Sequence, residues 1–207
     1  MPAVKSIGRQ AKCGPSTKRD AAEGCGEGCG NLGSWGRLRD VHKIVIERIT
    51  AAQVLLFKEV RLRALQDAPH AFGSTYAKEA EFTEAEWMRR AERWNGESGI
   101  GFLAMEEGTP CGIAGALLDE NDTTRARLVS MWTAPTHRQR GIGRLLVNEV
   151  HAWARGRGAR TLQLMVTSNN EPAMRFYDRL GFTRTGRTEP YPNDPAVIEY
   201  EMSRPIV

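Results

Sequence analysis

The segment that most constrains the fold is a strand-like run, a basic turn and a helix that follow one another without a break. The run ends at Trp132 and Thr133, the turn spans residues 134–141, and an amphipathic helix starts at Gly143. Such a helix points its first backbone N–H groups and the positive end of its dipole at the turn. Gly141 and Gly143 have no Cβ, so an anion can approach the main chain closely. The segment predicts a cradle for a phosphate or pyrophosphate group.

Two common phosphate-binding motifs do not fit this segment. The dinucleotide motif G-x-G-x-x-G fails at Leu146, and the chain has no G-x-x-x-x-G-K-S/T string. The run resembles instead the coenzyme A loop of the GNAT superfamily of N-acetyltransferases, Q/R-x-x-G-x-G/A. The matching residues are Arg138, Gln139, Arg140, Gly141, Ile142 and Gly143. A six-residue pattern also fits an ordinary glycine-rich turn, so a second motif is needed.

A second motif lies between residues 162 and 182. Residues 162–166 alternate as in a strand. Asn170 is suited to cap a following helix, and Gly181 to end it. The stretch is similar to the last GNAT signature, N-x-x-A-x-x-F/L-Y-x-x-x-G-F, at every named position. Together the two motifs extend the resemblance over roughly residues 41–202.

Composition favours one domain and excludes several classes of protein. The chain has 207 residues, and 41% of them are hydrophobic, which suffices for a sizeable core. No apolar run approaches the ~20 residues that span a bilayer. Seven Lys/Arg and four Asp/Glu lie in residues 1–40, which leaves 22 and 21 in the remainder. A nearly neutral body predicts no nucleic acid and no membrane partner.

The first 40 residues are expected to be a disordered extension, and residues 41–207 the N-acetyltransferase domain. The extension is rich in Gly, Ser, Lys and Arg and poor in large apolar residues. Cys25 and Cys29 suggest metal binding, but no Cys/His pair completes a zinc pattern. Cys13 lies in the same extension, and Cys111 is expected in the core. Three cysteines in the extension and one in the core do not form the disulfide framework of a secreted protein. We therefore expect the protein in the reducing cytoplasm and expect no metal site.

Hydrophobic periodicity and turn signals predict a fold of the α/β (α+β) class. The order β-α-α-β-β-β-α-β-α-β-β is the GNAT acyl-CoA N-acyltransferase arrangement, a central mixed sheet of about seven strands flanked by about four helices. Strands are expected over residues 43–49, 101–105, 112–118, 125–133, 162–166, 183–187 and 197–202. Helices are expected over residues 50–66, 83–94 and 143–157 and between Asn170 and Gly181.

The resemblance implies acetyl-CoA as cosubstrate and suggests where it binds. Backbone amides from Gln139 to Arg144 would face the pyrophosphate. The strand before the turn would splay from its neighbour around Trp132 and Thr133, pair with the pantetheine arm and offer a backbone N–H to the thioester oxygen. Asn170 would contact the same arm while it caps its helix. Arg138, Arg140 and Arg144 either add positive charge or lie on a solvated surface.

The same resemblance makes Tyr177 the acid that protonates the leaving thiolate, because its phenol pKa of about 10 suits a thiol. The alternative is that Tyr177 only packs against the sheet, although Phe176 is the expected packing residue. The position of the base in histone-modifying relatives is Arg127 here, and an arginine is no base at neutral pH. Another carboxylate, water or an amine that arrives neutral would serve. The candidate carboxylates are Glu79, Glu81, Asp119 and Glu199.

The expected function is direct transfer of the acetyl group of acetyl-CoA to a primary amine. Phe72, Tyr76, Trp132 and Tyr191 are the expected rim of the acceptor pocket, with His70 in the loop that borders it. An apolar and aromatic rim favours a small-molecule amine over a peptide amine. The alternatives are acetylation of a protein N-terminus or lysine and a non-catalytic acyl-CoA-binding module. The resemblance is compatible with a homodimer.

Overall fold

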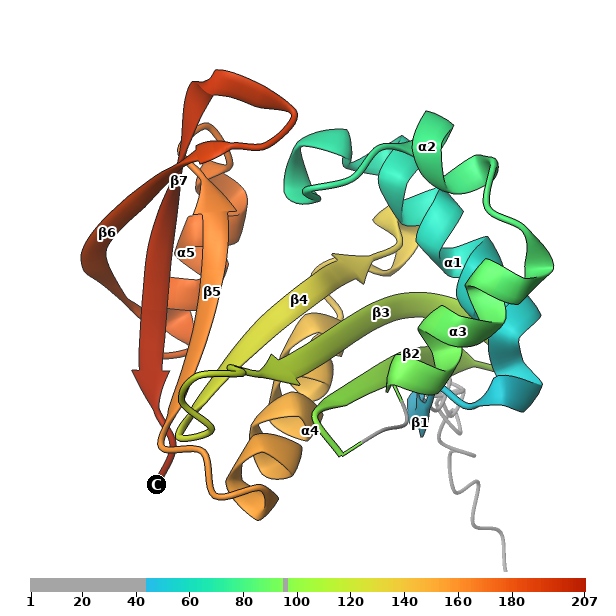
Figure 1. The fold of residues 1–207 in the computed structure, drawn as a ribbon, viewed down its shortest axis with the longest axis horizontal. Coiled ribbons are helices and arrows are strands. Elements are labelled where there is room, and N and C mark those ends of the chain that lie inside the picture. Colours follow the sequence, from blue (N-terminus) through green and yellow to red (C-terminus); the bar gives the residue numbers. More distant parts are fainter. Residues whose placement is uncertain (1–43, 95–96) are drawn as a thin grey trace, which may run out of the picture. The chain divides into compact units, whose positions relative to one another are not determined.

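The computed structural model describes residues 44–94 and 97–207. The extension expected over residues 1–40 lies outside these ranges. Seven strands form one sheet in the order β1-β2-β3-β4-β5-β7-β6 (Figure 1). They are β1 (Ile44–Arg48), β2 (Gly99–Glu106), β3 (Thr109–Leu118), β4 (Arg125–Thr133), β5 (Thr161–Thr167), β6 (Thr183–Tyr191) and β7 (Asp194–Pro205). The α-helices are α1 (Val54–Asp67), α2 (Tyr76–Ala80), α3 (Glu84–Trp94), α4 (Ile142–Gly156) and α5 (Glu171–Arg179).

The sheet is mixed, as the sequence predicted. β4 and β5 run parallel, and the other neighbouring strands pair antiparallel. Two apolar clusters cover its two faces: one contains residues of α4 and α5, and the other contains residues of α1 and α3. The fold class is confirmed. The helix that the sequence analysis did not foresee is α2, whose five residues are too few to show a helical period.

Helix capping follows the sequence closely. Thr83 and Glu86 form the expected capping box, with 2.7 Å from the Thr83 nitrogen to the Glu86 carboxylate. The Asn170 side chain accepts a hydrogen bond of 3.2 Å from the Ala173 nitrogen at the start of α5. Gly181 ends that helix in the left-handed region, with φ of 82°. These residues fix where α3 begins and where α5 begins and ends.

β4 and β5 separate partway along their length. They pair from Arg125 opposite Thr161 to Arg127 opposite Gln163, and the pairing ends there. Figure 1 shows the two strands diverging beyond this point. The unpaired backbone edges of residues 128–133 and 164–167 therefore face an opening in the middle of the sheet.

β4 also carries a bulge next to this opening. Val129 lies opposite Gly115 and Trp132 opposite Ile113, so β4 has one residue more than β3 over this stretch. Without a bulge, Leu128 and Trp132 would point to the same face of the sheet. Leu128 instead packs in the cluster under α4, and Trp132 packs in the cluster under α1. Because of the extra residue, the side chain of Trp132 points to the opposite face of the sheet from that of Leu128.

Within the described residues, no helix has both the length and the apolar character that crossing a membrane requires.

Candidate functional site

A cavity of about 1160 Å³ occupies the opening between β4 and β5. Its walls come from both diverging strands, the start of α4, α5 and the loop that follows α1. It brings together ten of the eleven residues that the sequence analysis assigned to the site. They are Trp132, Thr133, Arg138, Gln139, Gly141, Ile142, Gly143, Arg144, Asn170 and Tyr177. Arg140, the eleventh, is not among the lining residues.

The start of α4 forms one end of the cavity. Gly141 is the N-cap and has φ of 83°, a left-handed conformation that glycine adopts without strain. The first amides of α4, at residues 142–144, have no partner in the preceding turn of the helix. Their N–H groups and the helix dipole make this end attractive to an anion.

Gly143 is small for a reason that the sequence analysis did not give. A Cβ at this position would lie 3.0 Å from Cζ of Phe176 and 3.2 Å from Cε of Met131. These distances are shorter than ordinary packing contacts. The missing side chain therefore leaves room for the Phe176 ring of α5 and the Met131 side chain beside α4, in addition to leaving the main chain open to the cavity.

Carboxylates hold both arginines of the turn. Arg138 donates to the Thr133 carbonyl over 3.1 Å and forms an ion pair with Asp67. Arg140 forms an ion pair with Glu106 at the end of β2. The hydrogen bond from Arg140, with a further bond to His137, lowers the pKa of Glu106 to about 2. These contacts fix the turn to α1 and to β2.

The lining carries an excess of positive charge. Five arginines and one carboxylate, Glu199, contribute to it among the described residues. Three of the arginines lie in the turn, in the first turn of α4 and in α5, and they are Arg138, Arg144 and Arg179. The charge near the start of α4 fits a ligand with phosphate groups.

Tyr177 lies at the wall formed by α5 and is buried, with 7% of its surface exposed. Its ring centroid lies 5.2 Å from that of Phe176 and 5.6 Å from that of Phe182. Phe176, which the sequence analysis expected to be the packing residue, is less buried than Tyr177. Burial raises the pKa of Tyr177, so its hydroxyl stays protonated at neutral pH. The ring packs, and the hydroxyl group remains a donor.

The structure separates the four candidate carboxylates. Glu199 of β7 lines the cavity, opposite Thr167 of β5. Burial and the nearby charge of Glu189 raise the pKa of Glu199. Asp119 instead accepts backbone hydrogen bonds in the turn before β4, and Glu81 is exposed after α2. The sequence could not single out Glu199 because the register of β7 on β5 brings this residue to the cavity.

Glu79 is fully buried and bound to Arg61 through both carboxylate oxygens, at 2.9 and 2.7 Å. Burial alone would raise the pKa of Glu79, but the hydrogen bonds and charges of Arg61 and Arg90 outweigh it and lower the pKa. Glu79 therefore stays ionised in an ion pair. Arg61, which the sequence analysis did not single out, lines the cavity beside Ser130. No sequence motif marks a buried arginine in an amphipathic helix.

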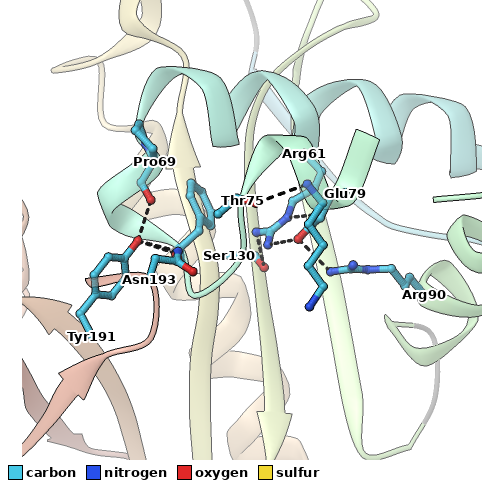
Figure 2. Close-up of polar contacts among 10 residues, drawn as sticks. Arg61, Pro69, Thr75, Glu79, Arg90, Ser130, Tyr191 and Asn193 are labelled. Atoms are coloured by element: carbon cyan, nitrogen blue, oxygen red, sulfur yellow. Dashed lines mark hydrogen bonds and ion pairs between the residues drawn. The ribbon is translucent and has the colours of Figure 1, made fainter. Parts of the chain in front are cut away.

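The loop between α1 and α2 is tied to the end of β6. The Tyr191 hydroxyl lies 2.8 Å from the carbonyl oxygens of both Pro69 and Phe72. Asn193 donates to the Phe72 carbonyl over 2.9 Å, and Thr167 to the His70 carbonyl over 3.2 Å. Figure 2 shows Tyr191 and Asn193 reaching this loop. The cavity thus has a fixed rim.

The expected rim residues have different places. Trp132 and Phe72 line the cavity, and both are also buried in the core under α1. His70 lines it as well. Tyr191 is buried and holds the loop rather than forming the lining, and Tyr76 is exposed and not among the lining residues.

Comparison with known proteins identifies the family. The family model described as "Acetyltransferase (GNAT) family" matches residues 62–182, more than half of the chain. The chain belongs to this family. The family prediction made from the two motifs is confirmed, because both lie within the matched range.

Individual relatives match parts of the chain. Streptothricin acetyltransferase of Streptomyces lavendulae is 44% identical over 62 residues, which are 30% of this chain and 33% of the relative. Mycothiol acetyltransferase of Thermomonospora curvata is 31% identical over 107 residues, 52% of this chain and 35% of the relative. The chain thus spans about a third of the length of these relatives. A putative acetyltransferase from Salmonella typhimurium, solved with its cofactor acetyl-CoA, has the same fold, with a TM-score of 0.66. The two sequences are 17% identical, and the match covers 80% of this chain and 95% of the Salmonella chain.

Proposed function

We propose that this chain transfers the acetyl group of acetyl-CoA directly to a primary amine of a small molecule. The observation that carries the proposal is the cavity between β4 and β5, with the start of α4 at one end and Glu199 in its lining. Acetyl-CoA supplies an acetyl group that is already activated as a thioester. The residues around the cavity hold it, orient it and move protons.

Binding falls to the turn and the separated strands. The first amides of α4 and the Arg144 guanidinium would bind the pyrophosphate. The unpaired edge of β4 would bind the pantetheine arm as an added strand would bind, with Asn170 at its side. A backbone N–H near Trp132 would donate to the thioester oxygen, where negative charge develops.

Proton transfer falls to Glu199 and Tyr177. The Glu199 carboxylate would take a proton from the acceptor ammonium, and its raised pKa makes it a stronger base. The amine nitrogen then bonds to the carbonyl carbon and loses its second proton to solvent, and the bond between that carbon and sulfur breaks. The Tyr177 hydroxyl would donate to the departing sulfur, and solvent would replace the proton that leaves Tyr177.

A small acceptor fits the fixed rim. The loop between α1 and α2 is bound to β5 and to the end of β6, so this wall of the cavity would not easily move aside for a large acceptor. Two relatives are named for streptothricin and mycothiol, and neither name states a protein. Both considerations favour a small amine over a protein N-terminus or lysine.

The test is a competition between acceptor classes. Small primary amines and short peptides, with free N-termini or lysines, are offered at matched concentrations with acetyl-CoA, and release of the free thiol is followed. We expect turnover with at least one small amine and weaker turnover with peptides. Turnover with peptides alone would reverse the acceptor class, and binding of acetyl-CoA without turnover would indicate a binding module. Glu199→Gln is the matched variant, because it retains size and loses the base.

A further inference from the structure

A buried ion-pair cluster lies between α1, α2 and α3. Arg61 of α1 is 5% exposed and binds Glu79 of α2 through Nε and Nη2. Arg90 of α3 donates to the same carboxylate over 3.3 Å. The Arg61 guanidinium also lies over the Phe72 ring, 4.5 Å from its centroid. These contacts from several elements leave the Arg61 side chain little freedom.

The remaining nitrogen of Arg61 reaches the β4 bulge. Nη1 donates to the Ser130 hydroxyl over 3.2 Å (Figure 2). Ser130 is one of the two residues between Val129 and Trp132 in the bulge, and its φ is 56°. Residues other than glycine rarely adopt this left-handed backbone conformation, because it costs them roughly 1–2 kcal/mol each. A contact that holds Ser130 in this conformation therefore offsets the free energy that its backbone conformation costs.

We propose that Arg61, fixed by Glu79, is a positioning residue that holds Ser130 in its left-handed conformation and thereby sets the path of β4 beside the cavity. The bulge decides which face of the sheet Trp132 occupies, because Leu128 and Trp132 would otherwise share a face. It also sets the direction of the backbone groups at residues 130–132, which line the cavity.

The effect on catalysis rests on the proposed function. If an N–H near Trp132 faces the thioester oxygen, a relaxed bulge would misplace that donor. A misplacement of about 1 Å can cost about 100-fold in rate. The pyrophosphate contacts at the start of α4 lie at a different part of the cavity and would change little, whereas the pantetheine contacts along β4 would weaken. The expected signature is therefore a loss in kcat that is larger than the loss in affinity for coenzyme A.

Two substitutions at Ser130 separate the backbone from the hydroxyl. Ser130→Ala removes the hydroxyl and keeps a Cβ in the strained conformation, so kcat should fall by at least about tenfold. Ser130→Gly also removes the hydroxyl, but glycine takes this φ freely, so kcat should fall clearly less than in Ser130→Ala. An equal loss in both variants would assign the requirement to the hydroxyl itself and overturn the proposal.

Arg61→Lys tests the arginine while keeping a cation beside Glu79. It should lower kcat by about tenfold, and adding Ser130→Gly should restore most of the loss, because the two act through one conformation. Arg90→Lys is the matched control, since Arg90 touches Glu79 and not Ser130, and it should leave kcat within about threefold. A loss in Arg61→Lys that Ser130→Gly does not relieve, or no loss at all, would overturn the proposal.

Hydrogen exchange gives a readout that does not depend on turnover. The amides of residues 129–132 should exchange faster in Ser130→Ala and Arg61→Lys than in the parent, and near the parent rate in Ser130→Gly. Unchanged exchange in Arg61→Lys would overturn the positioning role. If the parent transfers no acetyl group to any amine, the proposed function fails, and the exchange rates still decide whether Arg61 holds the bulge.

Discussion

Asp67, the last residue of α1, accepts a hydrogen bond of 2.8 Å from the indole nitrogen of Trp132 near the end of β4. The same carboxylate oxygen pairs with Arg138 of the turn before α4. One side chain therefore links α1, β4 and the turn, three segments that line or border the cavity. Arg63 adds to this link, since its guanidinium lies 5.6 Å from the centroid of the Trp132 ring.

Replacing Asp67 should show how much its contacts with Trp132 and Arg138 contribute to the free energy of unfolding. Asp67→Ala leaves the indole N–H of a buried tryptophan without its acceptor, which costs about 1–3 kcal/mol of unfolding free energy. Asp67→Asn retains an oxygen acceptor for Trp132 and loses only the charge beside the exposed Arg138, so its cost should be smaller. Urea unfolding of both variants measures the difference. Equal stability of the alanine variant and the parent would contradict the role of Asp67.

Gly141→Asp should abolish binding of coenzyme A. The substitution places a side chain at φ of 83° and a negative charge at the start of α4, where the proposed pyrophosphate would bind. Gly158→Asp is the control, because Gly158 has φ of 81° just beyond the other end of the helix. Titration calorimetry should find binding in the control and none in Gly141→Asp. Binding of similar strength in both variants would argue against the cradle.

Tyr177→Phe should lower turnover while affinity for coenzyme A changes little, because the ring keeps its contacts with Phe176 and Phe182. A loss of about 100-fold to 10,000-fold in kcat is the scale for a proton donor. Because burial raises the pKa of Tyr177, the parent should show no alkaline loss of activity from this group near neutral pH. Turnover equal to the parent, measured where chemistry limits the rate, would assign Tyr177 to packing alone.

The pH profile should reveal Glu199. Burial and the charge of Glu189 raise the pKa of Glu199, so kcat should fall as the pH decreases through that raised pKa and the base gains a proton. Glu199→Gln should lower kcat and remove this acid limb. Glu189→Gln should retain the limb and move it to lower pH, because a neighbouring negative charge is lost. An acid limb that persists unchanged in Glu199→Gln would exclude Glu199 as the base.

Local signals in the sequence predicted most of the fold. The cap at Asn170, the capping box at Thr83 and the glycine stop at Gly181 each act within a few residues, so their structures follow from the sequence alone. The turn around Gly141 is of the same kind. The short helix α2 was not predicted, because five residues are too few to show the helical period of hydrophobic residues.

The roles in the site that the sequence did not predict depend on contacts between distant segments. Arg61 and Ser130 are 69 residues apart in the chain, and Tyr191 binds a loop about 120 residues earlier. Glu199 reaches the cavity through the register of β7 on β5. The reason for Gly143 likewise lies in Phe176 on another helix. No local pattern carries such information, so these roles required the structure.

The most direct test of the proposed activity is mass spectrometry of a reaction with acetyl-CoA that carries an isotope label in its acetyl group. The account predicts labelled acetyl on the nitrogen of a small amine, one free coenzyme A for each acetylated amine, and no labelled acetyl on the protein. Labelled acetyl-CoA that binds but remains intact with every amine, or label retained covalently on the protein before transfer, would contradict direct transfer at this site.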